Sequence, residues 1–374
     1  VDTDGVSDQA ERANAEETIH DAQNHPDEMT DESRKDSRRS RRDRKSLDQE
    51  EAVWRSQLML PDWMIAVPEG LASQWLVTSR PQGKRCLVCA TGGRTTARLK
   101  TGKVLEVFSS VLPNGGAGGA GRVGGQDLTV LDCILVEESQ TFFVCDVLCW
   151  KGNTVTDCSS DFRLFWLQQK LAEDAPHAAV HDPARNSHPF VALPWYNADS
   201  AGLEACYQSL AVPFVRDGLQ FLHRESHYEG GLTPLMLLWK DLHCSTYLSE
   251  VYEGVDPSIQ VVCLKVRESE LLTCDEPPYV VARAPPEVCA GWQANRQGLA
   301  LFKIEGVSIA YSDDATATDA TAAVRVERME FHGRAALKRA DADSLSKLLF
   351  QQALRTLPLT IHDMAQAAER MEPA

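Results

Sequence analysis

The feature of this sequence that most limits its fold is a series of short apolar runs that alternate in the manner of β-strands. They begin near Glu50 and are separated by turn-forming residues. Runs of this length with β-branched and aromatic residues are typical of strands in antiparallel or mixed sheets. We predict strands at 75–79, 86–90, 128–137, 141–150, 217–223 and 233–241, and a smaller β-rich section at 259–266, 278–284, 299–311 and 325–333.

Helices are predicted where apolar residues recur at a period near 3.6. Asp161 is placed to cap a helix over 162–174, and residues 203–210 carry a second such pattern. A third helix covers 344–357 and ends before Pro358, and Thr360 with Asp363 has the spacing of a capping box for a last helix. The expected fold class is therefore α+β, with sheets flanked by helices.

The first 50 residues contain almost no large apolar side chains and change from an acidic stretch to a basic one. Such a segment cannot bury a core, so we expect an arm that is disordered on its own. A solvated tail and a nucleic-acid contact are both open interpretations of its basic run RKDSRRSRRDRK. The cations of this run are Arg34, Lys35, Arg38, Arg39, Arg41, Arg42, Arg44 and Lys45.

Composition excludes several classes of function. The formal net charge of −16 repels nucleic acid in bulk, so a phosphate would have to be bound by locally concentrated Lys and Arg. The 11 Cys are scattered singly through apolar runs, which fits reduced thiols in the cytosol or nucleus. Cys86 and Cys89 form one C-x-x-C, but residues three apart on a strand face opposite sides, so we expect no metal site. No apolar run approaches the about 20 residues of a membrane-spanning helix, so no membrane contact is expected.

Four motifs, in order, resemble those of the covalent nucleotidyltransferases, which include RNA guanylyltransferases and polynucleotide ligases. RPQGKR (80–85) falls at the place of K-x-D-G-x-R, DGLQF (217–221) at that of the E-G-hydrophobic motif, and DVLCWKG and LLWKD resemble the remaining two. Those enzymes attack a nucleotide phosphate with the motif Lys, which must be a neutral amine. Here Arg80 holds that position and Gln82 replaces the Asp, and a guanidinium stays protonated and is a poor nucleophile. We therefore expect no enzymatic activity and no cofactor.

Longer strings resemble the snurportins, a family of adaptors that bind the trimethylguanosine cap of spliceosomal small nuclear RNAs and whose cap-binding domain is related to guanylyltransferases. The strings follow the family order over residues 57 to about 243, and the segments DEPP (275–278) and 344–364 resemble the longer plant and protist members. The strings are QLMLPDWMIAVPEGL, GKR, LKTG, FSSVLPNG, TVLDCI, DVLCWKG, DFRLFW, DGLQFLHRESHY and TPLMLLW.

The resemblance implies a cap-binding site. An N7-methylated guanine is cationic and stacks on aromatic rings, and the phosphate bridge of the cap requires Lys or Arg. By position, Trp63 matches the family Trp beside the N2 methyl groups, Leu60 and Pro61 match residues under the first transcribed base, and Lys100 matches a Lys near the phosphates. Arg80 is a candidate phosphate contact. The main stacking Trp of the family matches Trp239 only with a one-residue shift, since Leu238 stands at the expected place.

The resemblance also implies the partners and the domains. We expect a nuclear import adaptor that links capped U snRNA particles to importin-β through the basic arm, is recycled by an exportin, and shuttles between nucleus and cytoplasm. The alternatives are a guanylyltransferase-type enzyme and a non-catalytic RNA-processing scaffold. The expected domains are the arm (1–50), a guanylyltransferase-like cap-binding domain (51–245) and a β-rich extension with C-terminal helices (246–374).

Overall fold

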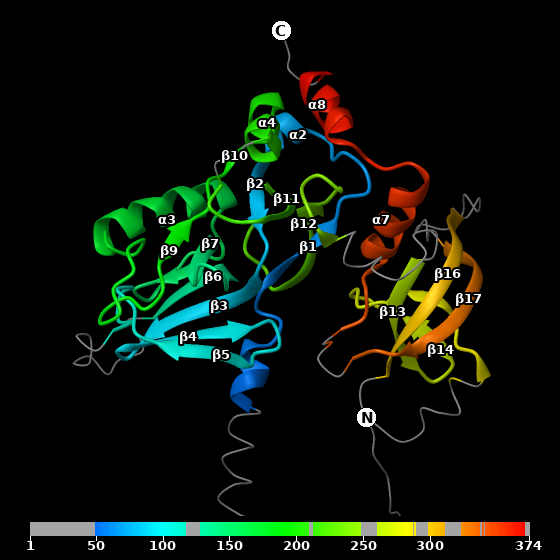
Figure 1. The fold of residues 1–374 in the computed structure, drawn as a ribbon, viewed down its shortest axis with the longest axis horizontal. Coiled ribbons are helices and arrows are strands. Elements are labelled where there is room, and N and C mark those ends of the chain that lie inside the picture. The colour runs from blue at the N-terminus through cyan, green and yellow to red at the C-terminus, as the bar shows by residue number, and fades with distance from the viewer. Residues whose placement is uncertain are drawn as a thin grey trace, which may run out of the picture. The chain divides into compact units, whose positions relative to one another are not determined.

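Three β-sheets contain most of the regular secondary structure of the described chain (Figure 1). The computed structural model describes residues 49–116, 128–208, 212–247, 260–286, 288, 298–310, 323–336, 339 and 341–370. Residues Gln49–Ala374 form one unit and Val1–Asp48 another. Residues 1–48 of the predicted arm, including its basic run, therefore lie outside the described residues, and residues 49 and 50 are helical.

The largest sheet has seven strands in the order β5-β4-β3-β6-β7-β8, with β9 parallel to β7. Every residue of β6 and nearly every residue of β7 is buried, because helix α3 (Ser160–Asp174) covers one face of the sheet with Leu167, Leu171 and Trp166. The strands are β3 (Lys84–Thr91), β4 (Arg94–Leu99), β5 (Val104–Phe108), β6 (Thr129–Val136), β7 (Thr141–Trp150), β8 (Asn153–Thr154) and β9 (Phe190–Ala192).

Helix α3 begins at Ser160, two residues before the predicted start at residue 162. Its N-cap residue is Ser159, and no side chain caps it. Asp161 lies instead in the first helical turn, where a carboxylate is favourable to the helix dipole, and its two oxygens accept hydrogen bonds from Arg224 at 3.0 Å. The predicted capping role of Asp161 was therefore wrong, although the helix itself is confirmed.

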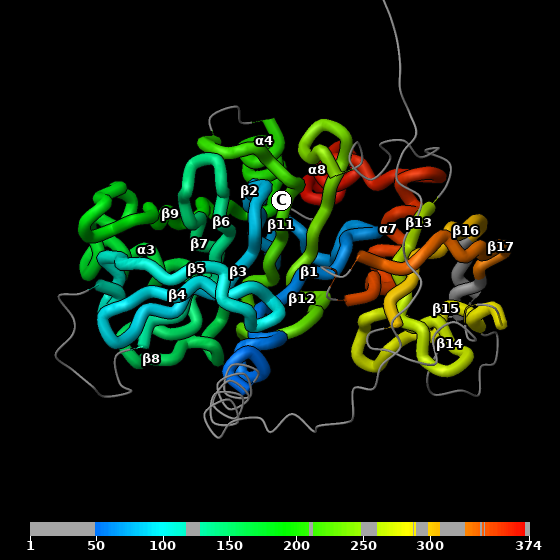
Figure 2. The backbone as a smooth tube through the Cα atoms, turned by 60° about the horizontal axis from the view of Figure 1, so that its bottom comes forward, coloured from blue at the N-terminus to red at the C-terminus, as the bar shows by residue number. Residues whose placement is uncertain are grey.

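The second sheet has the order β1-β12-β11-β2-β10. Strand β1 runs parallel to β12, with a register shift between Pro61 and Asp62, and the other neighbours are antiparallel (Figure 2). The strands are β1 (Met59–Trp63), β2 (Trp75–Pro81), β10 (Tyr196–Asn197), β11 (Arg216–His223) and β12 (Gly231–Trp239).

Three helices cover the core of this second sheet. Helix α8 (Ile361–Arg370) packs beside α2 (Leu71–Gln74) and α4 (Ser200–Gln208), as Figures 1 and 2 both show. Met364 and Ala368 of α8 are buried in the same cluster as Phe221 and Trp239 of the sheet. The last helix of the chain is therefore part of the core built by residues some 130 positions earlier, near Trp239.

The third sheet is the predicted β-rich section, with the order β15-β14-β13-β16-β17 and antiparallel neighbours throughout. Helix α7 (Leu345–Thr356) packs Leu348 against this sheet and Phe350 into the core of the second sheet. The strands are β13 (Gln260–Arg267), β14 (Glu270–Leu272), β15 (Val280–Arg283), β16 (Leu299–Ala310) and β17 (Ala323–Arg334).

The α+β class, the mixed and antiparallel sheets, the flanking helices and the β-rich C-terminal section are confirmed. The boundary at residue 245 stays a prediction. Within the described part of the chain, no helix is both long and apolar enough to cross a bilayer.

Candidate functional site

Three motif positions from distant parts of the chain meet at one end of the second sheet. Arg80 of β2 forms an ion pair with Asp217 of β11, and the Lys240 ammonium lies 2.5 Å from the other oxygen of the same carboxylate. The hydroxyl of Ser245 also donates to Asp217, at 2.8 Å. Because β2 and β12 both pair with β11, the ends of these strands bring the three charged groups together.

Gly218 allows β11 to lie close to the end of β12. Its φ is +100°, and a Cβ there would lie 2.5 Å from the carbonyl oxygen of Trp239 and 2.8 Å from the Lys240 side chain. A side chain would therefore push β11 away from the end of β12. The D-G pair of DGLQF thus serves to place the Asp217 carboxylate beside Lys240.

Two cations share one carboxylate in this cluster, which we call the Asp217 cluster (Arg80, Asp217, Lys240 and Ser245). Burial and, to a smaller extent, the charge of Arg80 lower the pKa of Lys240 to about 8, against the raising effect of Asp217. Burial also lowers the pKa of Arg80, against the raising effect of Asp217, but a guanidinium remains charged. The Arg80 Nε is buried without a hydrogen-bond partner among the described residues.

Trp63 lies at the end of β1 beside this cluster, in a group of rings and ammonium groups. Its ring centroid is 5.3 Å from that of Tyr247 and 4.7 Å from that of Phe350. The Lys240 ammonium lies 5.7 Å from the Trp63 ring and 4.8 Å from the Tyr247 ring, and Lys347 lies 5.9 and 5.8 Å from the same two rings. Trp63 as a whole residue is half-buried. We call these residues the Trp63 box (Trp63, Tyr247, Lys240, Lys347 and Phe350).

The other predicted residues of β1 lie apart from the Trp63 box. Leu60 and Pro61 are half-buried and pair with Leu232 and Thr233 of β12. Leu60 packs against the cluster that contains Leu58 and Leu87 rather than against Trp63.

Lys100 is exposed in the turn between β4 and β5. Its ammonium lies 3.1 Å from Asp341, just before α7. An exposed pair of this kind contributes little to stability, so the ammonium is available to an anion.

Trp239 is fully buried, which contradicts its predicted stacking role. Its ring packs among the core side chains of the second sheet, and its indole N–H donates to the carbonyl of Leu359 at 3.0 Å. Tyr207 lies against it, with 6.0 Å between ring centroids. No ring face is left for a ligand, because α8 and the segment before it cover this side of the sheet. Leu238 is also buried, at 6% exposure.

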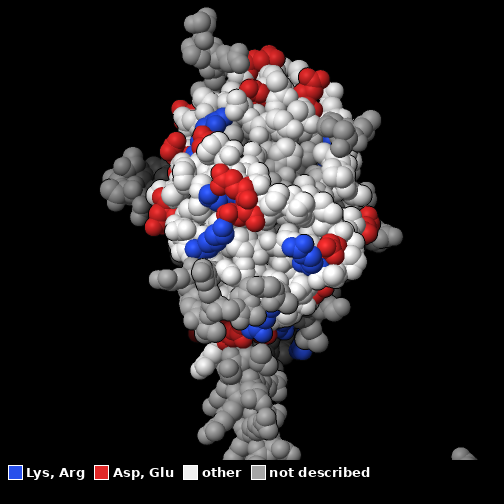
Figure 3. Space-filling model, turned by 90° about the vertical axis from the view of Figure 1, so that its left-hand side faces the viewer, with Lys and Arg blue, Asp and Glu red and all other residues white. Residues whose placement is uncertain are grey.

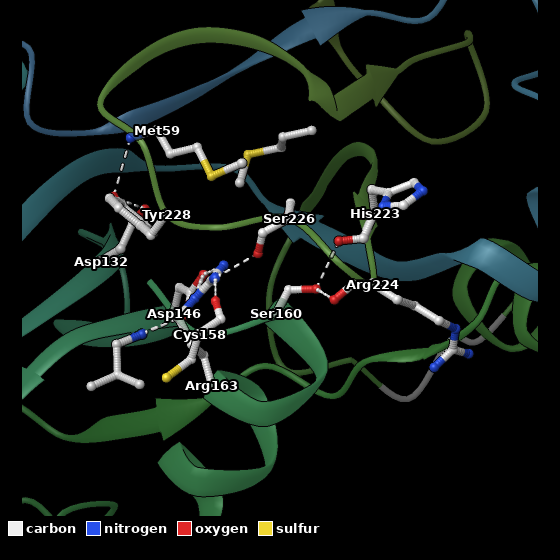
Figure 4. Close-up of polar contacts among 12 residues, drawn as sticks. Met59, Asp132, Asp146, Cys158, Ser160, Arg163, His223, Arg224, Ser226 and Tyr228 are labelled. Atoms are coloured by element: carbon white, nitrogen blue, oxygen red, sulfur yellow. Dashed lines mark hydrogen bonds and ion pairs between the residues drawn. The ribbon is translucent and has the colours of Figure 1, made fainter. Parts of the chain in front are cut away.

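A second set of motif residues forms a buried ionic network (Figure 4). Asp132 and Asp146 are paired across β6 and β7, and Asp132 accepts two hydrogen bonds from Arg85 whereas Asp146 accepts three from Arg163. Arg85 binds Asp132 at 3.0 and 2.7 Å, and Arg163 of α3 binds Asp146 at 3.0 and 2.8 Å. The Tyr228 hydroxyl adds a bond of 2.8 Å to Asp132.

This network gives a structural role to several of the strings that resemble the family. Arg163 is completely buried and also donates to the carbonyls of Cys158 and Ser226 at 2.7 Å, as Figure 4 shows. Paired and fully hydrogen-bonded charges are tolerated in a core, whereas a lone one is not. The strings DVLCWKG and DFRLFW therefore supply an ion pair between the large sheet and α3, and TVLDCI supplies Asp132 for a pair with Arg85 within that sheet.

Of the Asp217 cluster and the Trp63 box, the sequence prediction found only Arg80 and Trp63. Asp217 and Lys240 lay within the DGLQF and LLWKD strings, so the motif resemblance contained the signal for them. Tyr247 and Lys347 lie beyond the strings, and nothing in the sequence pairs them with Trp63. The eight predicted importin-binding cations lie outside the described residues.

The electrostatic character of the described surface is mixed. On the face at the left of Figure 1, Lys and Arg side chains lie beside Asp and Glu, and the described residues form no continuous basic patch there (Figure 3). This face offers no array of cations for a nucleic-acid backbone.

Comparison with known proteins identifies the segment that carries the Asp217 cluster and Trp63. Residues 57–241 match the family "Snurportin1, m3G cap-binding domain". Among solved structures, the fold is similar to a mycobacterial DNA ligase D complexed with ATP (15% identity, 76% of this chain and 97% of that one, TM-score 0.35). It is also similar to the ligase domain of M. tuberculosis LigD (13%, 74% and 95%, TM-score 0.34) and to Chlorella virus DNA ligase-adenylate (8%, 75% and 99%, TM-score 0.32). The family match from residue 57 to residue 241 identifies a snurportin cap-binding domain in this chain and supports a snurportin-like protein.

Proposed function

We propose that this protein binds the 2,2,7-trimethylguanosine (m3G) cap of U snRNAs and acts as a nuclear import adaptor for the capped particles. The observation that carries the proposal is the Trp63 box within and beside the family segment. The indole of the half-buried Trp63 is the candidate surface for the methylated base, and base–aromatic contacts contribute about 1–3 kcal/mol. The ammonium groups of Lys240 and Lys347, within 6 Å of the same ring, supply charge for the phosphate bridge.

The test of cap binding is a fluorescence titration. We expect m3G cap dinucleotide to quench Trp fluorescence and to bind more tightly than the monomethylated cap, because the two N2 methyl groups add apolar surface beside Trp63. Trp63→Leu should weaken binding by about tenfold, which corresponds to one lost stacking contact. Trp166→Phe, on α3, is the matched control. Equal affinity for the two caps would count against the assignment of Trp63.

We propose further that the protein is not an enzyme. The nucleophile position holds Arg80, and this guanidinium is engaged by Asp217. Incubation with labelled GTP and Mg²⁺ should leave the protein unlabelled. A covalent protein–GMP adduct would overturn this proposal in favour of a nucleotidyltransferase.

The import role rests on the basic run at 34–45. Importin-β recognises Arg and Lys arrays as the segment folds, and this run has the appropriate charge. The proposal includes recycling by an exportin and shuttling between nucleus and cytoplasm. Deletion of residues 34–45 should abolish retention of importin-β in a pull-down while leaving cap binding unchanged. Unchanged retention would overturn the importin-β part alone.

A further inference from the structure

Helix α7 holds the end of β1 at the residues that carry the candidate site. The backbone N–H of Trp63 donates to the Ser346 hydroxyl at 3.1 Å, and the same hydroxyl donates to the Asp62 carboxylate. Ser344, the N-cap of α7, lies 3.1 Å from Ser346 between hydroxyl oxygens. The backbone and the side chain at the end of β1 are thus both bound to one serine on a helix outside residues 57–241.

The same helix fixes the rings of the Trp63 box. The ring of Phe350 packs on that of Trp63, with 4.7 Å between centroids, and its own side chain is buried. One residue further along, Gln351 donates to the Tyr247 hydroxyl at 3.0 Å. Trp63 and Tyr247 are therefore both held by side chains of α7, through Phe350 and Gln351.

Lys347, between these residues, brings a cation to the box. Its ammonium lies 2.7 Å from Asp343, which also accepts a hydrogen bond from Arg339, so two cations share this carboxylate. Burial alone would lower the pKa of Lys347, but Asp343 and Tyr247 raise it above its ordinary value. Lys347 is therefore charged at neutral pH, and Asp343 compensates that charge only in part.

We propose that α7 is a component of the cap-binding site, with Lys347 binding a phosphate of the cap bridge and Ser346 acting as the residue that positions Trp63. This inference rests on the proposed function. The phosphate bridge is joined through the ribose to the base that Trp63 would contact, so a cation that binds the bridge must lie near that ring, as Lys347 does. A long flexible side chain with a shared counter-ion can turn toward an added anion at small cost.

The first experiment separates phosphate binding from base binding. Wild type and Lys347→Met are titrated with m3G cap dinucleotide and with the trimethylguanosine nucleoside, which has no phosphate. We expect Lys347→Met to bind the dinucleotide about tenfold more weakly, with a shallower salt dependence, and to bind the nucleoside as wild type does. Lys347→Arg should retain most of the affinity, and Lys265→Met, an exposed lysine of β13, is the control. An unchanged affinity for the dinucleotide, or an equal loss for both ligands, would overturn the role of Lys347.

The second experiment tests positioning. Ser346→Ala should reduce the preference for the trimethylated over the monomethylated cap, because Trp63 is no longer held at its backbone N–H. Ser346→Thr, which restores the hydroxyl, should restore the ratio. A ratio unchanged in Ser346→Ala would overturn the role of Ser346. If wild type does not bind the trimethylated cap, the proposed function and this inference fall together, whereas binding by wild type with unaltered variants removes the inference alone.

Discussion

At the scale of single residues, two places in the site each have two cations that share one carboxylate. Asp217 serves both Arg80 and Lys240, and Asp343 serves both Lys347 and Arg339. A buried cation that is only partly compensated has an unfavourable desolvation energy, which an anionic ligand relieves. Lys240 shows this most clearly, because its pKa is lowered to about 8.

Lys240 therefore makes stability depend on pH. Its folded pKa of about 8 lies below the ordinary value of 10.5, so between these two values the unfolded chain binds more protons than the folded one. As the pH increases through this window, the free energy of unfolding of wild type should therefore rise relative to that of Lys240→Met, by up to about 1.4 kcal/mol per pH unit. Urea unfolding at several pH values between 7 and 10 measures this difference.

The control for that measurement is Lys84→Met, which removes an exposed lysine paired with Glu137. It should leave the pH dependence of wild type unchanged. A constant difference between wild type and Lys240→Met across the window would show that Lys240 keeps its ordinary pKa.

At the scale of elements, patterns of neighbouring residues in the sequence correctly predicted the helices α3, α7 and α8. The capping box at Thr360 and Asp363 is confirmed, because the Asp363 N–H donates to the Thr360 hydroxyl at 3.2 Å and the Thr360 N–H donates to the Asp363 carboxylate at 2.9 Å. Capping depends on residues three apart, and the sequence displays that spacing directly. Apolar periodicity located α3 and α7 for the same reason.

The capping box of α8 gives a prediction at this scale. Thr360→Ala should lower the free energy of unfolding by about 1 kcal/mol, since the first turn of α8 loses the hydroxyl that accepts the Asp363 N–H. Thermal unfolding followed by circular dichroism measures it. Thr356→Ala is the control, because that hydroxyl bonds only within the last turn of α7, to Gln352. Equal effects of the two substitutions would mean that the box does not hold α8.

Pairings between distant elements could not be predicted from the sequence. The parallel contact of β1 with β12 and the placing of Ser346 on Trp63 join segments that no local pattern connects. The burial of Trp239 has the same origin, because α8 covers it from the far end of the chain. Family resemblance located Trp63 and the motif strings, but it could not show that Trp239 lies beneath a helix outside the matched segment.

At the scale of the whole molecule, the last two helices complete the core of the second sheet. Phe350 of α7 and Met364 of α8 are buried in the cluster that contains Trp75 and Trp239. Each buried side chain of this size contributes about 1.5–3 kcal/mol. The segment that matches the family is therefore not a complete folding unit in this protein.

A chain truncated after Asp343 tests whether the core of the second sheet needs the last two helices. It loses α7 and α8, so Trp239 becomes exposed, Trp emission shifts to longer wavelength, and the free energy of unfolding falls by several kcal/mol. A chain truncated after Arg370 serves as the control and should behave as the full chain does. Unchanged emission in the shorter chain would show that the core closes without these helices.

The hydrogen bond between Trp63 and Ser346 spans 283 residues of sequence. Contacts of such long range form late, after the cost of closing the intervening chain has been met, and a chain emerging from the ribosome folds first from its N-terminal part. During synthesis, the end of β1 must therefore wait until helix α7 has been translated before the backbone N–H of Trp63 gains its hydrogen-bond acceptor. Under the proposed function, a nascent chain would be unable to hold a capped RNA at Trp63 before α7 has folded against β1.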